Sequence, residues 1–241
     1  MEPNQTPSPV ETVTAPQFKL SIPAAIIVAG FIIAVAILAV GFVGKGGDSE
    51  QAKAPIAVNI KDVNLAGEPF VGNPNATPIA YFSDFQCPFC KKFETGNIVS
   101  LKKDYVDTGK IKIVFKDFVF LGPDSVDAAV YARAVWSLYP NEYYAWRQAM
   151  FTAQDQEGNV GFGNRKSIEA LTKTIPGIDQ AKVSANLDAN KDAYSKAVDA
   201  DYVEGQKLGV QGTPSVIIGK TIIDGAYPLS SYTDALKNAV K

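Results

Sequence analysis

A long uninterrupted apolar run lies near the start of the chain, at Ala24–Val43. Its 20 residues match the length that an α-helix needs to cross a bilayer, and the run lacks the polar face of a helix packed on a globular core. We therefore expect a transmembrane signal anchor over residues 23–43. A cleaved signal peptide is the alternative, but the segment before the run is long and acidic, with Lys19 as its only basic residue.

The segments on either side of this run contain few clustered apolar residues. Residues 1–22 are rich in Pro, Thr and Glu, a composition that favours disorder. Residues 44–55 contain Gly, Lys and Asp and are expected to form a linker. A folded domain is therefore expected over residues 56–241.

Within this domain the apolar pattern changes twice. A strand, a helix and a second strand come first, an order that implies a parallel strand pair with a crossover helix. From about 123 to 208 the pattern is helical, with apolar helix faces at 125–138, 142–152, 167–174 and 192–208. Residues 215–223 then predict a short β-hairpin, and 232–240 a last helix. The three leading elements are expected at 78–85, 87–105 and 111–118. The fold class is therefore α/β, interrupted by a helical insertion.

The amino-acid composition excludes several classes of function. The 241 residues carry a net charge of −2, which argues against a nucleic-acid or other polyanion binder. The chain has no histidine, which excludes His-ligated metals and Ser-His or Cys-His nucleophile pairs. Its two cysteines are too few for a scaffold with several disulfides. We expect neither a metal nor another cofactor.

The two cysteines form the motif Cys87-Pro88-Phe89-Cys90, between a predicted strand and a predicted helix. The helix N-terminus offers free N–H groups and the positive end of a dipole, and both stabilise a thiolate at Cys87. Cys90 follows within reach of a disulfide bond. Pro88 suits the first helical turn, where an N–H would have no intrahelical partner. This arrangement favours redox chemistry at Cys87 and Cys90.

Two other interpretations of the motif are less favourable. A structural zinc site needs four ligands, and two cysteines without any histidine would require two carboxylates as well. Two inert core cysteines are also disfavoured, because the first residue of a helix is usually exposed.

A second motif, Gly212-Thr213-Pro214-Ser215, precedes the predicted strand of the hairpin. Proline is unfavourable before a central strand, since it cannot donate to the hydrogen-bond ladder. A cis Thr213–Pro214 bond in a tight loop beside the cysteines would explain its presence. An ordinary Thr-Pro turn is the alternative.

The segments FSDFQCPFC and GVQGTPSVIIG, with the helical insertion between them, resemble the thioredoxin superfamily and, within it, the DsbA-like membrane-anchored thiol:disulfide oxidoreductases. The resemblance covers roughly residues 56–241. It implies a thioredoxin-like fold, with Cys87 as the nucleophile and Cys90 as the resolving thiol. It also implies that Pro214 is the cis-proline and that Thr213 docks the substrate peptide.

The chain departs from this family at two positions. Phe89 replaces a histidine of DsbA and adds no charge, so Cys87 should be less acidic than in a strongly oxidising site. Tyr81 stands at the strand position where many thioredoxin-like proteins hold a buried acid. The nearest carboxylate is Asp84, which either moves a proton to or from Cys90 or caps the start of the helix.

The resemblance implies an oxidase that introduces disulfides into cysteine-containing secreted or surface proteins and is reoxidised by a quinone-linked membrane partner. We expect a monomer, held in a bacterial cell membrane by one span, with its catalytic domain on the extracytoplasmic side. Lysines after the span weakly favour the opposite orientation. A reductase or isomerase with the same site, and a non-catalytic tethered chaperone or peptide-binding module, are the alternatives.

Other conspicuous residues are expected to have structural roles. Lys116 and Asp117, at the end of the second strand, are expected to be solvated. The aromatic residues of the helical insertion are expected to form its core: Trp136, Tyr143, Tyr144, Trp146 and Phe151.

Overall fold

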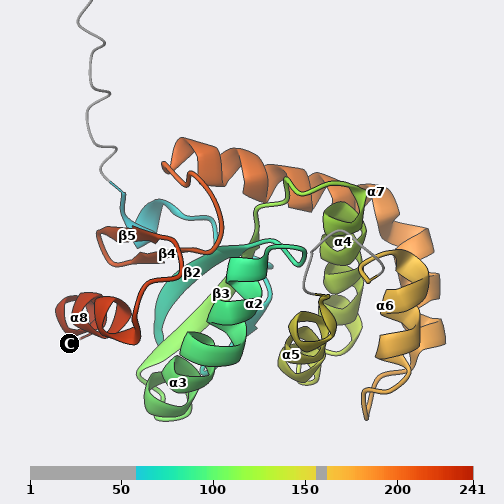
Figure 1. Cartoon of the computed structure of the whole chain (residues 1–241), viewed down its shortest axis with the longest axis horizontal. Helices are drawn as coiled ribbons and strands as arrows, with labels where there is room; N and C mark the ends of the chain where they lie inside the picture. The colour runs from blue at the N-terminus through green and yellow to red at the C-terminus, as the bar shows by residue number, and fades with distance from the viewer. Residues whose placement is uncertain (1–57, 156–161, 241) are drawn as a thin grey trace, which may run out of the picture. The chain divides into compact units, whose positions relative to one another are not determined.

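The computed structural model describes residues 58–155 and 162–240, which form a five-stranded sheet with helices packed on it (Figure 1). The strand order is β1-β3-β2-β4-β5. β2 and β3 are parallel, as predicted, and the other neighbouring strands are antiparallel. The strands are β1 (Phe70–Val71), β2 (Thr77–Ser83), β3 (Ile111–Asp117), β4 (Ser215–Ile218) and β5 (Thr221–Asp224).

A continuous stretch of helix connects β2 to β3 and carries the cysteine motif at its start. It contains two π-helical segments, η2 and η3, between and after its α-helical parts. The apolar positions Phe93, Ile98 and Leu101 are buried, in agreement with the helical pattern. The parts are α2 (Pro88–Phe93), η2 (Glu94–Ile98), α3 (Val99–Leu101) and η3 (Lys102–Val106).

The helical insertion lies between β3 and β4, where the sequence predicts it. In Figure 1, α4, α5 and α6 stand together beside the sheet, and α7 leads from them back toward β4. The pattern predicted only the second half of α7, which begins at Gln180 and is capped there by the Asp179 side chain. The helices are α4 (Pro123–Leu138), α5 (Tyr143–Ala153), α6 (Arg165–Thr172) and α7 (Gln180–Lys207).

Two further elements complete the described chain. The 3₁₀-helix η1 (Ile60–Asp62) precedes β1, and α8 (Leu229–Ala239) follows the β4–β5 hairpin. The hairpin and the final helix both follow the sequence pattern, although α8 begins earlier than predicted.

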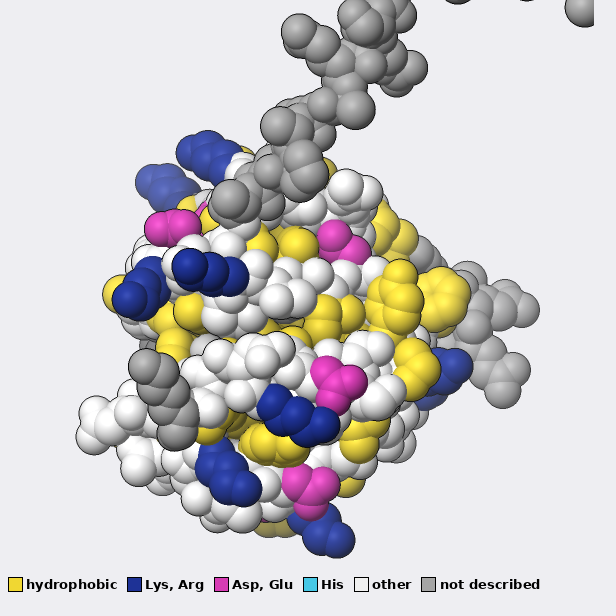
Figure 2. Space-filling view, turned by 90° about the vertical axis from the view of Figure 1, so that its left-hand side faces the viewer, with side chains coloured by type: hydrophobic (Ala, Val, Ile, Leu, Met, Phe, Trp, Pro, Cys, Tyr) yellow, Lys and Arg dark blue, Asp and Glu magenta, His cyan; other side chains and the backbone are white. Residues whose placement is uncertain are grey.

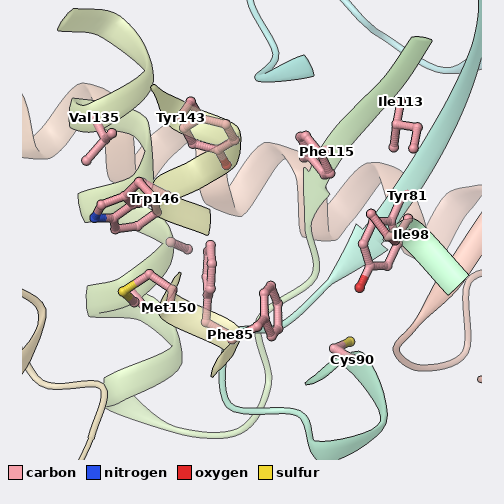
Figure 3. Packing of buried hydrophobic residues seen from close by; sticks show 14 of the residues in the cluster. Tyr81, Phe85, Cys90, Ile98, Ile113, Phe115, Val135, Tyr143, Trp146 and Met150 are labelled. Atoms are coloured by element: carbon pink, nitrogen blue, oxygen red, sulfur yellow. The ribbon is translucent and has the colours of Figure 1, made fainter. Parts of the chain in front are cut away.

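Both faces of the central strand β2 are buried, which explains its almost continuous apolar sequence. Ile79 and Tyr81 belong to the larger core, which contains the cysteines and most of the helical insertion. Ala80 and Phe82 point to a smaller core on the opposite face. Figure 3 shows part of the larger core, in which Phe85 and Trp146 pack edge to face with ring centroids 5.8 Å apart.

The expectation that Lys116 and Asp117 are solvated is wrong. Lys116 is 1% exposed and Asp117 is 7% exposed. The Lys116 ammonium is 3.1 Å from Glu68 and also contacts Asp201. The Arg133 guanidinium is 2.7 Å from Glu68 and 2.8 Å from Asp117. Paired charges can be buried because each partner replaces the lost water, and a residue pattern along one strand does not reveal such partners.

The predicted disordered segment (1–22), signal anchor (23–43) and linker (44–55) lie outside the described residues. Among the helices of residues 58–155 and 162–240, none has both the length and the hydrophobicity that crossing a membrane requires. The longest, α7, has 28 residues but carries charged side chains along its length.

One face of the molecule shows how surface charge is distributed. On the side of α8 and β5, basic and acidic side chains are interspersed among hydrophobic and uncharged ones (Figure 2). This mixture agrees with the small net charge of −2 and gives this face no single-sign field.

Candidate active site

The cysteine motif lies directly after β2, where the chain turns into α2. Cys87 is the N-cap residue of α2 and has extended backbone angles, φ −77° and ψ 119°. Pro88 occupies the first turn and needs no partner for a missing N–H. Cys90 lies within this turn and is fully buried, whereas Phe89 between the two cysteines is 64% exposed. Both cysteines are free thiols in this structure.

The environment of Cys87 favours its thiolate. A hydrogen bond from the Cys90 side chain, helped by the Thr213 side chain and the backbone N–H groups of Cys90 and Phe89, lowers the pKa of Cys87 from 9.0 to about 6. Burial opposes this shift and is outweighed. Cys87 is therefore largely a thiolate at neutral pH, the form that attacks disulfides.

Cys90 has the opposite character. Burial, followed by its hydrogen bond to Cys87 and the nearby Cys87 charge, raises the pKa of the Cys90 thiol well above 9. One cysteine of the pair is thus a ready nucleophile and leaving group, while the other keeps its proton. This asymmetry matches the roles that the resemblance implies for the two residues.

The second motif lies next to the first. The Thr213–Pro214 peptide bond is cis, as expected from the sequence. The Thr213 carbonyl accepts a hydrogen bond from the Cys87 thiol over 3.3 Å, although the two residues are 126 positions apart. The β2–β4 pairing, with Phe82 opposite Ser215, holds the two loops together. The loop therefore borders Cys87.

Asp84 lies beneath the site and is fully buried. Its carboxylate accepts hydrogen bonds from the Ser125 hydroxyl at 2.6 Å and the Gln86 N–H at 2.8 Å. It also accepts bonds from the backbone N–H groups of Phe120 and Leu121. The cap position of α2 belongs to Cys87 and has no side-chain cap, so the helix-capping interpretation of Asp84 is wrong. Asp84 instead joins the cysteine loop to the segment that leads into α4.

A buried ion pair one helical turn beyond Cys90 was not predicted from the sequence. Glu94 and Arg147 are almost fully buried, with 2.5 Å between Oε1 and Nε. Arg147 also donates to the Ser83 hydroxyl, and its guanidinium lies 4.2 Å from the centroid of the Phe115 ring. One signal pointed to this pair, since Glu94 is four residues after Cys90 and falls on the same buried helix face.

Gln154 is a second residue that sequence reasoning missed. Its amide nitrogen donates to the carbonyls of Phe85, at 2.6 Å, and Cys87, at 3.2 Å. The Gln154 backbone carbonyl accepts a hydrogen bond from the Lys91 ammonium. Gln154 therefore ties the end of α5 to both sides of the cysteine motif. Nothing in its sequence neighbourhood indicates this role.

The aromatic residues of the insertion mostly follow expectation. Tyr143, Trp146 and Phe151 are buried, while Trp136 and Tyr144 are partly buried against the same core.

Within residues 58–155 and 162–240, no three or more His, Cys, Asp or Glu side chains are grouped so that they could hold a metal ion.

Sequence comparisons relate the chain to proteins of disulfide chemistry. A family model described as thioredoxin matches residues 64–238. Disulfide bond formation protein D of Bacillus subtilis is 24% identical over 179 residues, which cover 74% of this chain and 79% of that protein. The probable disulfide bond formation protein D of Bacillus anthracis is 25% identical over 162 residues, 67% of this chain and 71% of its own length.

Solved structures share the architecture. Oxidised BdbD of Bacillus subtilis superposes with a TM-score of 0.68 at 23% identity, covering 76% of this chain and 97% of that one. The thiol-disulfide exchange protein alpha-DsbA2 of Wolbachia pipientis gives a TM-score of 0.63 at 29% identity, covering 72% and 87%. The predicted thioredoxin-like α/β fold with a helical insertion is confirmed by these matches.

Proposed function

The chain belongs to the thioredoxin family and is a DsbA-like protein thiol:disulfide oxidoreductase, and on this premise we propose that it acts as an oxidase. In this proposal the Cys87–Cys90 disulfide is passed to pairs of cysteines in secreted or surface proteins. The Thr213–Pro214 loop receives the substrate as an extended peptide beside Cys87. The chain works as a monomer.

The observation that carries the oxidase direction is the stabilised Cys87 thiolate. Its pKa of about 6 lies well below the ordinary 9.0. A thiolate exists only in the reduced protein, so every group that stabilises it favours the dithiol over the disulfide. A disulfide whose reduced form is stabilised is readily transferred to a substrate.

The proposed cycle has two exchange steps. A substrate thiolate attacks Cys87, the Cys87–Cys90 bond breaks, and a mixed disulfide forms between the substrate and Cys87. The second substrate thiol then attacks the substrate sulfur of this bond and releases Cys87 as a thiolate. The substrate leaves oxidised and the enzyme is left reduced. A quinone-linked membrane partner restores the Cys87–Cys90 disulfide.

We place this reaction on the extracytoplasmic side of a bacterial membrane, with residues 23–43 as the anchor. The apolar run Ala24–Val43 supports an anchor, and the outer location supplies the oxidising conditions in which disulfides persist. Alkaline phosphatase fused after Lys241 tests the orientation, because it is active only outside the cytoplasm. An inactive fusion that is nevertheless produced in full would contradict the proposed location.

The reduction potential of the Cys87–Cys90 pair tests the direction of transfer. The purified chain is equilibrated in glutathione buffers and the oxidised fraction is measured. The proposed oxidase should have a potential above about −180 mV, as disulfide donors do. A potential below about −250 mV would place it with the reductases.

Trapping tests whether Cys87 is the attacking residue. In a Cys90→Ser variant the Cys87 thiolate can still attack the disulfide of an oxidised substrate, the reverse of the release step. The resulting mixed disulfide should accumulate, because Cys90 is no longer there to resolve it. Cys87→Ser should form no such adduct and should lose all turnover. A Cys87→Ser protein that keeps its full function would instead indicate a peptide-binding module.

A further inference from the structure

One buried polar group beside the cysteines has no hydrogen-bond partner among the described residues. The Tyr81 side chain is fully buried, and its hydroxyl meets no donor or acceptor at hydrogen-bond geometry. Such a group is costly in a low-dielectric core, because it has lost its water and received nothing in return. A buried hydroxyl without a hydrogen-bond partner therefore suggests a functional role.

The Tyr81 hydroxyl faces the buried cysteine. Figure 3 shows the ring projecting from β2 with its oxygen directed toward Cys90. Burial, the neighbouring Cys90 sulfur and the Glu94 carboxylate together raise the pKa of the Tyr81 phenol well above 10. The phenol therefore keeps its proton throughout the physiological pH range and can only donate or accept a hydrogen bond.

The ring is held in one orientation by its neighbours. It packs edge to face against Phe93, with centroids 5.1 Å apart, and against Phe115 at 6.2 Å. The Arg147 guanidinium lies 5.3 Å from its centroid on the side of the helical insertion. The hydroxyl is thus presented to the sulfur by a rigid core, which is the arrangement expected of a preorganised donor.

The nearby carboxylates are already engaged elsewhere. Glu94 accepts hydrogen bonds from Arg147 and Gln148 through its two oxygens. Asp84 is occupied by Ser125 and backbone N–H groups. The Thr213 side chain, in the proline loop, helps to lower the pKa of both cysteines from that side. Tyr81 is the hydroxyl that faces Cys90 from the sheet.

We propose that the Tyr81 hydroxyl donates a hydrogen bond to the Cys90 thiolate that is expelled when a substrate opens the Cys87–Cys90 disulfide. Tyr81 is then a catalytic residue, because it contacts a reacting atom. It occupies the strand position of a buried acid but acts without releasing its own proton. The inference deepens the proposed exchange reaction and rests on it.

The proton and electron balance of the step is simple. The incoming thiolate forms a bond to the Cys87 sulfur, and the electron pair of the broken S–S bond stays on Cys90 as negative charge. The second substrate thiol later loses its proton as it attacks, and that proton ends on Cys90. Cys87 carries the final negative charge. Tyr81 stabilises the intermediate thiolate between these two events.

The test compares Tyr81→Phe with Tyr131→Phe. Tyr131 is 1% exposed and its hydroxyl is likewise unpartnered, so its variant loses the same atom from an equally buried ring packed against Trp146. Reduced glutathione is mixed with the oxidised full-length proteins and the rate of disulfide opening is followed. Tyr81→Phe should react about tenfold more slowly, corresponding to about 1.4 kcal/mol of lost stabilisation, whereas Tyr131→Phe should match the parent protein.

A second readout separates this role from a purely structural one. In the Cys87→Ser background Cys90 is the only thiol, and the pH dependence of its alkylation reports its pKa. Tyr81→Phe should raise this pKa by about one unit, as expected for a tenfold loss of thiolate stabilisation, and Tyr131→Phe should leave it unchanged. Unchanged rate and unchanged Cys90 pKa in Tyr81→Phe would overturn the inference.

The same experiment distinguishes failure of the inference from failure of the proposed function. If the parent protein opens its disulfide with glutathione while Tyr81→Phe behaves identically, only the role of Tyr81 is refuted. If the parent protein forms no disulfide or does not exchange it, the proposed function itself fails.

Discussion

Arg147 in α5 is paired with Glu94, one helical turn beyond Cys90, with 2.5 Å between Nε and Oε1. This contact crosses from the helical insertion to the helix that begins at the cysteine motif. The guanidinium also lies within about 5 Å of the Phe151 and Phe85 ring centroids. The insertion is therefore joined to this helix through its core.

Removing one partner of this pair should destabilise the protein strongly. Arg147→Leu leaves the Glu94 carboxylate buried without its counter-charge, which should lower the free energy of unfolding by about 3–5 kcal/mol. The double variant Arg147→Leu/Glu94→Leu removes both charges and should recover much of that loss. Urea unfolding of the reduced proteins measures both effects. A single variant within 1 kcal/mol of the parent would contradict the importance of the pair.

The reactivity of Cys87 should depend on pH in a defined window. Its pKa is lowered to about 6, so the thiolate persists at neutral pH and is lost only as the pH falls through that value. Alkylation of the reduced protein by iodoacetamide should reach half its maximal rate near pH 6. Reaction at Cys90, isolated in Cys87→Ser, should begin only well above pH 9. A midpoint for Cys87 near 9 would remove the basis of the oxidase proposal.

The same lowered pKa couples redox state to stability. The stabilising contribution of the thiolate to the reduced fold is complete above the unfolded value of 9.0 and disappears as the pH falls through about 6. As the pH falls from 9 to 6, the reduced protein should therefore lose stability relative to the oxidised protein. Denaturant titrations at several pH values measure it, and a pH-independent difference would contradict the shift.

Glu68 should give the fold an opposite pH dependence. Burial, only partly offset by Arg133 and Lys116, raises its pKa to about 7, while Asp201 and Asp117 add to the increase. An acid with a raised pKa stabilises the fold fully below its unfolded value of 4.5, and this contribution is lost as the pH rises through about 7. Glu68→Gln should remove this component, so its difference from the parent should vary between pH 4.5 and 7. A constant difference would show that Glu68 does not titrate there.

Two glycines should respond to alanine with opposite signs. A Cβ at Gly205 in α7 would lie 2.7 Å from a ring carbon of Phe118, so Gly205→Ala should cost about 1–3 kcal/mol through overpacking. A Cβ at Gly96 would meet no atom within 4 Å, and Gly96→Ala should stabilise by about 0.5–1 kcal/mol through lower backbone entropy. Thermal unfolding measures the stability of both variants. Stabilisation by Gly205→Ala would contradict the close packing.

The sequence allowed much of the site and fold to be predicted, because local rules operate there. Cys87 follows a buried strand and begins a helix, and Pro214 precedes a central strand in an otherwise unfavourable position. The first half of α7 was missed because it contains few apolar residues, and packing against α4 rather than an amphipathic pattern supports it.

Other features depend on partners that are distant in the sequence. Lys116 is buried because Glu68 and Asp201 come to it from separate segments. Gln154 reaches the cysteine loop only through the placement of α5. The role of Asp84 follows from backbone N–H groups of another loop, which no spacing within its own segment reveals.

The helical insertion also determines when the site can exist during synthesis. Cys87 and the Thr213 carbonyl that borders it are separated by 126 positions, with all of the inserted helices between them. A nascent chain that has emerged only as far as α6 already carries both thiols but lacks β4 and the proline loop. Its Cys87 then lacks the contribution of the Thr213 side chain, and the chain has no proline loop beside the thiol. Completion of the C-terminal hairpin is therefore the event that turns a cysteine-containing polypeptide into a working catalyst.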